Sequence, residues 1–328
     1  MKIAVVILNW NGKELLEKFL PSLISYSTKA GLYVIDNAST DDSLLFLKEH
    51  YPSIQIIALE ENFGFAKGYN EGLKQIDADT YCLLNNDVEV TKHWLDPIFS
   101  AFENTSVSIA QPTLLQHKKK NYFDYAGAAG GYIDQFGFPY CRGRIFDQLE
   151  ENTNQYNTTT DCFWASGACF FVRQSVWEEL NGFDEDFFMH QEEIDFCWRA
   201  FNAGKVTQTI GDSFVYHVGG ASLKPSARKT YYNHRNSLWM MIKNLPKNTL
   251  FPVLFQRFIL DGVAGIHYLL KGNFGAFFMV IKAHIAVYVN LSKMLRKRSS
   301  SLSKGAYFQQ KSIVWAHFIL RKSKFQDL

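Results

Sequence analysis

A short polar run after an apolar segment is the first place where this sequence carries residues able to do chemistry. The apolar residues Tyr81–Leu84 are followed at once by Asn85, Asn86 and Asp87. In open α/β sheets ligands bind at the carboxyl ends of strands, and a carboxylate there can hold a divalent cation that bridges nucleotide phosphates. The alternative is that these residues only form a turn, where Asn and Asp are favoured.

A cluster of acidic residues is the second such place. Glu192, Glu193 and Asp195 lie at the start of a predicted helix, with aromatic residues on both sides. Burial of neighbouring carboxyl groups raises the pKa of at least one of them, which suits a general base near neutral pH. Two simpler explanations stay open: acids favour a helix N-terminus, and Asp195 can pair with Arg199 four residues later.

The third place is a histidine that follows a short apolar run. His217 comes directly after Phe214–Tyr216 and precedes the glycines Gly219 and Gly220. A histidine in this setting is either a packed core or rim residue, or a ligand for a metal or a phosphate beside a loop that can move.

The elements that must position these residues follow an alternating pattern. The sequence predicts strands over 3–8, 32–35, 54–59 and 81–84, and helices over 13–26, 41–50 and 65–75, with Ser39 or Thr40 as the N-cap of the second helix. Strict alternation of strands and helices is typical of βαβ units and a parallel sheet. The predicted fold is therefore α/β, with a mostly parallel sheet flanked by helices.

Polar residues at the ends of these strands should meet at one edge of the sheet. Asp36 can accept two hydrogen bonds from a base or ribose, Asn9 offers amide groups, and Gly64 permits close approach of the backbone. We interpret Asp41 and Asp42 as residues that cap the second helix. The predicted nucleotide-binding residues at this edge are Asn9, Asn11, Asp36, Asn37, Asn62, Gly64, Ala66, Asn70, Asn85, Asn86 and Asp87.

The rest of the chain changes character twice. Residues 116–160 read as an irregular excursion over one face of the sheet, and regular structure is predicted again at 169–172, 175–180 and 192–203. Helices are predicted over 231–242, 255–270 and 274–291, rich in apolar and basic residues.

Because no apolar stretch of 18 residues is uninterrupted, we predict no transmembrane helix. The region 246–298 could lie on a membrane surface, pack as a helical subdomain, or form a homodimer interface.

Composition sets further limits. The chain has 328 residues, a net charge of +2 and five widely spaced cysteines without a CxxC pair. This balance gives no reason to expect a nucleic-acid partner, and the cysteines favour reduced thiols over disulfides or a zinc site. No signal peptide is predicted, because the apolar run Ile3–Leu8 is too short. We expect a cytoplasmic protein, with the inner face of the cell membrane as its point of peripheral contact.

Several motifs occur together in the order known from one enzyme family. They are VVILNWNG (5–12), VIDNASTDDS (34–43), ENFGFAKGYNEGL (61–73), LLNNDVEV (83–90), ASGACFFVRQSVWEELNGFDEDFF (165–188), EEIDFCWRAFNAG (192–204) and HVGGAS (217–222). Over residues 1–240 the chain resembles the family 2 inverting glycosyltransferases with the GT-A fold, in particular their bacterial rhamnosyltransferase-like branch. The resemblance implies a GT-A domain over 1–240, with a nucleotide-binding half (1–115) and a catalytic half (116–240), followed by a helical region (241–328).

The resemblance also implies roles for individual residues. Asp36 would bind the nucleoside, and Asp87 would be the metal ligand, since Asn85 stands where the family motif DXD has its first Asp. His217 would complete a site for Mg²⁺ or Mn²⁺. Glu193 would be the catalytic base, although the family more often has Asp there, so Glu192 stays an alternative. The predicted donor-sugar or acceptor contacts are Trp164, Gly167 and Asp195.

The implied reaction moves a sugar from a UDP- or dTDP-sugar to a hydroxyl of a glycan or lipid-linked saccharide, in polysaccharide assembly. Two other classes were compared with it. A sugar-phosphate nucleotidyltransferase usually has a glycine-rich basic loop after its first strand, and residues 9–14 fit that poorly. A non-catalytic protein that binds nucleotide sugars or glycans would need no buried acid cluster.

Overall fold

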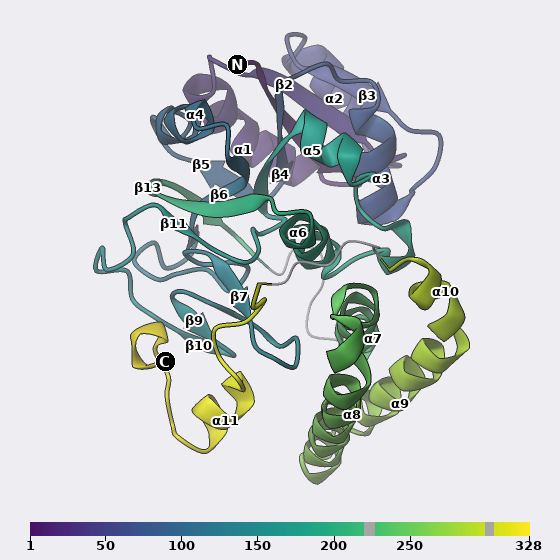
Figure 1. Ribbon diagram of the computed structural model, residues 1–328. Coiled ribbons are helices and arrows are strands. Elements are labelled where there is room, and N and C mark those ends of the chain that lie inside the picture. The colour runs from purple at the N-terminus through teal and green to yellow at the C-terminus, as the bar shows by residue number, and fades with distance from the viewer. Residues whose placement is uncertain (220–226, 299–304) are drawn as a thin grey trace.

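A computed structural model describes residues 1–219, 227–298 and 305–328. At its centre is a nine-stranded sheet in the order β11-β13-β6-β12-β4-β1-β2-β3, with β5 paired to β13 (Figure 1). The strands of this sheet are β1 (Ile3–Asn9), β2 (Gly31–Asp36), β3 (Gln55–Ala58), β4 (Thr80–Asn85), β5 (Val88–Val90), β6 (Val107–Gln116), β11 (Thr160–Asp161), β12 (Cys169–Arg173) and β13 (Val206–His217).

The first half of the chain forms the predicted parallel sheet. Strand β1 pairs in parallel with β2 and β4, and β2 pairs in parallel with β3. The register places Asn9 opposite Asp36 and Leu8 opposite Asn85, so the polar carboxyl ends of these strands are level. The prediction of one polar edge built from successive strands is confirmed.

Helices cover both faces of the sheet because successive strand residues point to opposite sides. In β1, Ile3 and Val5 belong to one hydrophobic cluster, whereas Ala4 and Val6 belong to the other. Helices α1 (Lys13–Tyr26), α2 (Ser43–His50) and α4 (Asp96–Glu103) bury their apolar residues in the first cluster. Helices α3 (Gly64–Leu73), α5 (Gln174–Glu179) and α6 (Glu192–Asn202) bury theirs in the second.

Helix α2 begins later than predicted, at Ser43 rather than Asp41. Neither Ser39 nor Thr40 is its N-cap. The Asp41 side chain accepts a hydrogen bond from the backbone N–H of Ser43 at 3.0 Å, as a capping residue would, whereas Asp42 makes no side-chain capping bond. Asp42 occupies the N-cap position, as predicted, and Asp41 supplies the side-chain hydrogen bond.

The second half of the sheet is mixed. Strand β12 is antiparallel to both β4 and β6, while the long strand β13 runs parallel to β6. The excursion predicted as irregular carries a second, four-stranded sheet in the order β10-β9-β8-β7. Its strands are β7 (Gly131–Ile133), β8 (Pro139–Cys141), β9 (Arg144–Ile145) and β10 (Gln148–Leu149). These strands were missed because two or three residues are too few to show a periodic pattern.

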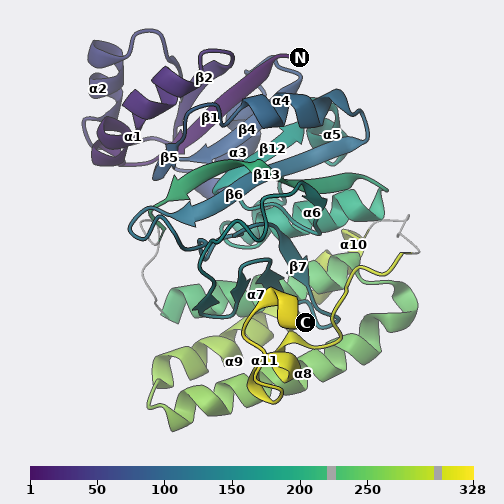
Figure 2. The same ribbon diagram turned by 90° about the vertical axis from the view of Figure 1, so that its left-hand side faces the viewer.

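The C-terminal helices form a layer beyond α6 (Figure 2). They are α7 (Ala227–Asn244), α8 (Lys247–Leu270), α9 (Phe274–Val289), α10 (Leu291–Arg296) and α11 (Ile313–Phe318). The predicted domain boundary at residue 240 falls inside α7. Helix α8 starts eight residues earlier than predicted, since it begins after Pro246 and continues through Pro252.

Helix α8 is also long and apolar enough to cross a membrane by length and composition alone. Our prediction of no such helix rested on uninterrupted apolar length, and Arg257 and Asp261 interrupt this one. The five cysteines are buried free thiols, as expected for a chain without disulfides.

Candidate active site

Amide side chains connect the ends of the central strands. The Nδ2 atom of Asn9 donates to Asp36 at 3.4 Å and to Ser39 at 3.3 Å, while its Oδ1 accepts from Nδ2 of Asn86 at 3.1 Å. Gly12 is required beside them, because a Cβ atom at this position would lie 2.3 Å from Nδ2 of Asn86. This network joins β1, β2 and the turn after β4 into one rim.

Asp36 is fully buried within this rim. Its two carboxylate oxygens accept hydrogen bonds from Asn9 and from the backbone N–H of Ser39. Asp36 thereby orders the loop that follows β2. Each carboxylate oxygen can accept a second hydrogen bond, so the contact of Asp36 with the nucleoside stays a prediction.

A second set of amides shapes the start of α3. The buried Asn37 donates to Oδ1 of Asn62 at 3.0 Å and to the carbonyl of Gly64 at 3.1 Å, and it accepts from the N–H of Phe63. Gly64 has a φ of +75°, and a Cβ atom there would lie 2.8 Å from the ring of Phe188. Only glycine fits position 64, where the loop that carries Phe188 meets the start of α3.

The candidate metal ligands lie together at the end of β4 and β13. Oδ1 of the buried Asp87 lies 3.2 Å from Nε2 of His217, and Nδ1 of His217 lies 2.9 Å from Oδ1 of Asp124. Burial alone would lower the pKa of His217, but hydrogen bonds and charges of Asp124 and Asp87 raise it to about 10. Burial would raise the pKa of Asp87, and His217 nevertheless lowers it. Gly220 to Ser222 of the same motif lie outside the described residues.

Asp124 was not among the predicted site residues. It lies within the excursion 116–160, which has no recognisable motif, and only the fold brings it to His217. A carboxylate that holds the far nitrogen of a histidine is the usual arrangement behind a metal-bound imidazole. A buried carboxylate oxygen and an imidazole nitrogen that face each other are both ordinary metal ligands, so this donor set fits a divalent cation.

The residues described contain no cluster of three histidine, cysteine or acidic groups placed to hold a metal by themselves. Two protein ligands suffice for Mg²⁺ or Mn²⁺ when substrate phosphates and water supply the others. The arrangement of Asp87 and His217 is thus compatible with a cation that also binds substrate phosphates.

The acid cluster reaches the same region through the loop before β12. The N–H of Asn85 donates to the carbonyl of Ala168 at 3.0 Å, and a Cβ atom on the preceding Gly167 would lie 3.9 Å from Cβ of Glu193. Glu193, in the first turn of α6, is therefore close to the turn that carries Asp87. Gly167 lies beside Glu193, and its contact with a sugar stays a prediction.

Burial dominates the electrostatics of the two glutamates. It raises the pKa of Glu193 to about 7, although several backbone N–H groups oppose the shift. The pKa of Glu192 is raised well above its ordinary value, first by burial and then by the charge of Glu193. Glu193 therefore exchanges a proton easily near pH 7, while burial and the charge of Glu193 favour the neutral form of Glu192.

Unsatisfied polar atoms gather around these acids. Four atoms in this segment are buried without a hydrogen-bond partner among the described residues: His190 Nε2, Gln191 Oε1, Glu192 Oε2 and Glu193 Oε2. Such atoms cost free energy unless a ligand satisfies them. The backbone is strained at the same place, because Phe188, His190 and Gln191 all have φ between 64° and 68°.

Several predicted site residues have structural roles instead. Asn11 accepts hydrogen bonds from the backbone of Thr40 and Asp41, and Asn70 holds the backbone of Phe183 from α3. Both side chains hold backbone in place, and their contact with a nucleotide stays a prediction.

Ala66 and Trp164 are core residues. Ala66 is fully buried in α3, and Trp164 is 4% exposed, with its indole N–H donated to the carbonyl of Tyr132. Ala66 therefore offers no side chain to a nucleotide, and the indole of Trp164 offers no free polar group to a sugar. Trp164 stands directly before the motif at 165–188, and that position carries no information about its burial.

Asp195 also points away from the site. It is fully buried and accepts from Arg199 at 2.8 Å, Lys243 at 2.7 Å and Asn244 at 2.9 Å. The predicted substrate contact is wrong, and the simpler pairing with Arg199 is confirmed. Lys243 also binds Asp184 at 2.6 Å, so the pairing fastens α6 and the loop before it to α7.

We expect Lys243→Met to lower the free energy of unfolding by about 3–5 kcal/mol, because it leaves Asp195 and Asp184 short of a buried partner. Urea unfolding followed by circular dichroism measures this loss. Lys293→Met is the matched control, since Lys293 binds Asp186 at the surface and should change stability by less than about 1 kcal/mol. Equal effects of the two changes would contradict the structural role of Asp195.

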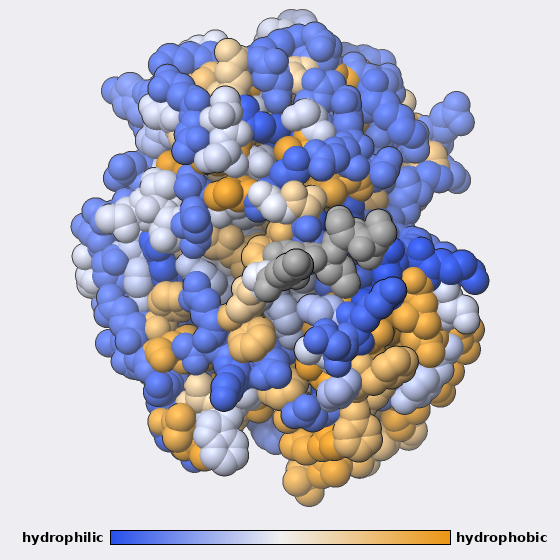
Figure 3. Space-filling model, viewed as in Figure 1, coloured by the Kyte–Doolittle hydropathy of each residue, from blue (hydrophilic) through white to orange (hydrophobic). Residues whose placement is uncertain are grey.

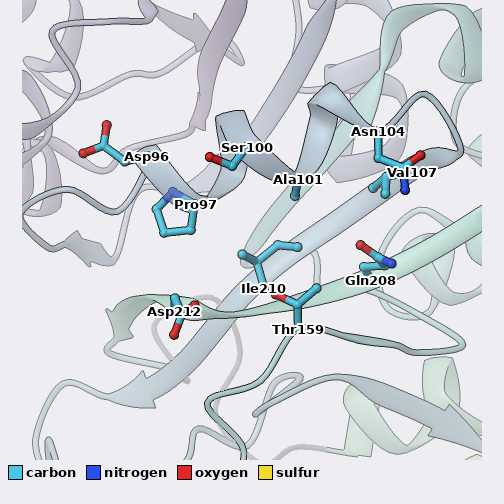
Figure 4. Close-up of a pocket in the computed structure, with 10 residues that line it drawn as sticks. All are labelled: Asp96, Pro97, Ser100, Ala101, Asn104, Val107, Thr159, Gln208, Ile210 and Asp212. Carbon is cyan, nitrogen blue, oxygen red and sulfur yellow. The ribbon is translucent and has the colours of Figure 1, made fainter.

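A separate surface hollow lies between α4 and β13. Its lining includes Asp96 and Ser100 from α4 and Gln208 and Asp212 from β13 (Figure 4). None of the predicted site residues lines it. The chemistry suggested by the motifs therefore belongs to the polar edge of the sheet and not to this hollow.

Comparison with known proteins agrees with the geometry. A low-salt glycan biosynthesis hexosyltransferase, Agl10 of Haloferax volcanii, is 24% identical over 60% of this chain and 61% of its own length. An N-acetylglucosaminyl-diphospho-decaprenol L-rhamnosyltransferase of Mycobacterium tuberculosis is 24% identical over 66% of this chain and 75% of its own. This chain thus spans somewhat less than two thirds of the archaeal relative.

Solved structures show the same fold. GalNAc-T7, crystallised with UDP, GalNAc and Mn²⁺, superposes with a TM-score of 0.59 at 14% identity, over 75% of this chain and 48% of that one. The predicted GT-A architecture, a mostly parallel sheet flanked by helices, is confirmed. The family model described as glycosyl transferase family 2 matches residues 4–180, which is more than half of the chain. The protein carrying this polar edge and acid cluster therefore belongs to glycosyl transferase family 2 and is a glycosyltransferase.

Proposed function

We propose that this protein transfers a sugar from a UDP- or dTDP-sugar to a hydroxyl group with inversion at the anomeric carbon, in a reaction that depends on Mg²⁺ or Mn²⁺. The observation that carries the proposal is the convergence of three groups on one edge of the sheet. They are the rim around Asn9 and Asn86, the pair Asp87 and His217, and the buried glutamates of α6.

Glu193 acts as the base in this proposal. The carboxylate takes the proton from the acceptor hydroxyl as that oxygen forms a bond to the anomeric carbon. The bond between this carbon and the phosphate oxygen breaks on the opposite face, and the nucleoside diphosphate leaves with the electron pair. A base with a pKa of about 7 can accept the proton and release it again near neutral pH.

Asp87 and His217 would hold the divalent cation, which supplies positive charge to the diphosphate leaving group. Asp124 holds His217 in the orientation that turns Nε2 toward Asp87. Asn37, Asn62 and Gly64 keep the loop before α3 in the shape that a nucleotide would meet. The Mn²⁺ and UDP in the GalNAc-T7 structure support this choice of ligands.

The acceptor we propose is a glycan or lipid-linked saccharide used in the assembly of a cell-surface polysaccharide. The diphospho-decaprenol in the name of the mycobacterial relative supports a lipid-linked acceptor. Such an acceptor places the enzyme on the cytoplasmic face of the cell membrane. A non-catalytic binding protein would not need the unsatisfied acids of α6, and membership of family 2 disfavours a nucleotidyltransferase.

A panel of nucleotide sugars tests the proposed function. In the presence of Mn²⁺, we expect one UDP- or dTDP-sugar to raise the melting temperature, because a ligand at about 100 times its Kd adds about 2.7 kcal/mol to stability. Nuclear magnetic resonance of the product should then show an anomeric configuration opposite to that of the donor. A product of retained configuration, or no protection by any nucleotide sugar, would overturn the proposal.

A further inference from the structure

The outer side of the C-terminal helices carries two rows of exposed apolar side chains. On α8 they recur every three or four residues, so they form one stripe along the helix: Phe251, Phe255, Ile259, Val263, Ile266 and Leu270. A second stripe on α9 consists of Phe274, Phe278, Ile281, Ile285, Tyr288 and Val289. We call these twelve residues the apolar face of the α8–α9 hairpin. Figure 3 shows apolar residues gathered over these helices.

The two stripes lie side by side on a helical hairpin. The ring of Phe258 lies 5.1 Å from that of His284 and 5.7 Å from that of Tyr288, whereas Gly265 lies against Phe277. The helices are thus antiparallel neighbours. A continuous apolar surface of this extent is not expected on a protein surface without a partner.

The charges around this face have one sign. Asp261 is the single acidic residue between positions 246 and 298, and it is fully buried. Lys247, Lys271, Lys282 and Arg296 are all exposed. An apolar face bordered by basic residues, with no exposed carboxylate on its helices, complements anionic lipid head groups. A second copy of the same positive surface would be repelled by it.

The polar interior of the hairpin prevents α8 from spanning a bilayer. Asp261 binds Arg257 at 3.0 Å, His234 of α7 at 3.1 Å and His284 of α9 at 3.2 Å. Arg257 also donates to the carbonyl of Phe136 at 2.9 Å. Because these buried bonds hold α8 lengthwise against the rest of the molecule, a spanning orientation would expose them to hydrocarbon.

We propose that the apolar face of the α8–α9 hairpin docks on an anionic lipid bilayer, with both helices parallel to the membrane surface. The proposal rests on the proposed function in one respect, since a lipid-linked acceptor would be reached from a bilayer. Docking would hold the glycosyltransferase at the surface where such an acceptor is anchored.

Vesicle flotation of the full chain tests this docking without any measurement of activity. We expect the protein to float with vesicles made of equal parts phosphatidylglycerol and phosphatidylcholine, and much less with phosphatidylcholine alone. Phe255→Asp combined with Phe278→Asp should lower the partition coefficient at least about tenfold, because it places one charge in each stripe. These side chains are 68% and 59% exposed, so the variant should fold.

Leu45→Asp is the matched control, since Leu45 is 55% exposed but lies on α2. It should float like the unchanged protein. A second variant, Lys271→Glu combined with Lys282→Glu, should weaken binding to anionic vesicles and abolish its dependence on salt. This variant decides the question if the apolar one fails to fold.

Unchanged flotation of both double variants would overturn the docking proposal. The proposal would also be overturned if the unchanged protein does not float with vesicles but forms a dimer, and the Phe255→Asp, Phe278→Asp variant dissociates that dimer. A failure of the proposed function would look different. The protein would then transfer no sugar from any nucleotide sugar to a soluble acceptor, while its flotation with vesicles would be unaffected.

Discussion

Glu193→Gln should lower the rate of sugar transfer at least ~10²-fold, while the affinity for the nucleotide sugar stays within about twofold. The amide keeps the shape of the side chain but cannot take the proton from the acceptor hydroxyl. Glu193 lies beside Gly167 in the first turn of α6, and the described residues leave its Oε2 atom without a hydrogen-bond partner. Steady-state kinetics give the loss in kcat, and calorimetric titration with the donor gives the affinity.

The pH dependence of the unchanged enzyme should report the same group. Burial raises the pKa of Glu193 from 4.5 to about 7, so the active carboxylate becomes more abundant as the pH rises through 7. We expect kcat/KM to rise about tenfold per pH unit below this value and to level off above it. The residual activity of Glu193→Gln should not show this rise of kcat/KM with pH.

Stability should respond in the opposite direction to activity. A carboxyl group whose pKa is raised on folding binds its proton more tightly in the folded state, so its ionisation destabilises the protein as the pH rises. Near pH 8 Glu193→Gln should therefore melt at a higher temperature than the unchanged protein. Such a result would show that lost activity does not come from misfolding.

Glu192→Gln is the matched control for the base. Burial and the charge of Glu193 raise the pKa of Glu192 and so favour its neutral form, which an amide resembles. We expect this variant to keep most of its activity. An inactive Glu192→Gln beside an active Glu193→Gln would move the catalytic role by one residue.

The parallel half of the sheet could be predicted because its signals are local. Apolar runs such as Tyr81–Leu84 end in polar residues, and the side-chain period of two places those residues at a common edge. The positions of Asp87, His217 and Glu193 around one site follow from the order of motifs and the level ends of the strands.

The direction of an individual side chain could not be predicted in this way. Asp195 and Glu193 share one motif and one helix turn, yet the first is bound by Lys243 and the second faces Gly167. Asp36 and Asn70 are likewise occupied by protein groups that are distant in the sequence. Lys243 and Asp124 escaped notice because tertiary contacts alone give them their roles.

Asp87→Asn should weaken binding of Mn²⁺ at least about tenfold and lower kcat by about 10²–10³-fold at a fixed metal concentration. The change removes the anionic ligand, and His217 alone remains to hold the cation. Titration of Mn²⁺ into the protein with nucleoside diphosphate present, followed by the spectrum of the free ion, measures the affinity. Excess Mn²⁺ should restore part of the activity.

Two further variants separate ligand loss from a general change in charge. Glu89→Gln removes the same charge close by, from a residue paired with His117 and Lys120, and should leave the affinity for Mn²⁺ unchanged. Asp124→Asn should weaken it about 10–100-fold although it is not a ligand, because Asp124 orients His217.

Binding of Mn²⁺ should also tighten as the pH rises. Asp124 and Asp87 raise the pKa of His217 to about 10 against the effect of burial, so the cation must displace a proton from the ring. Below that pKa each pH unit is worth up to about tenfold in affinity for one displaced proton. Affinity for Mn²⁺ that is independent of pH and unchanged in Asp87→Asn would place the metal elsewhere, and the catalytic site would then need neither Asp87 nor His217 as a ligand.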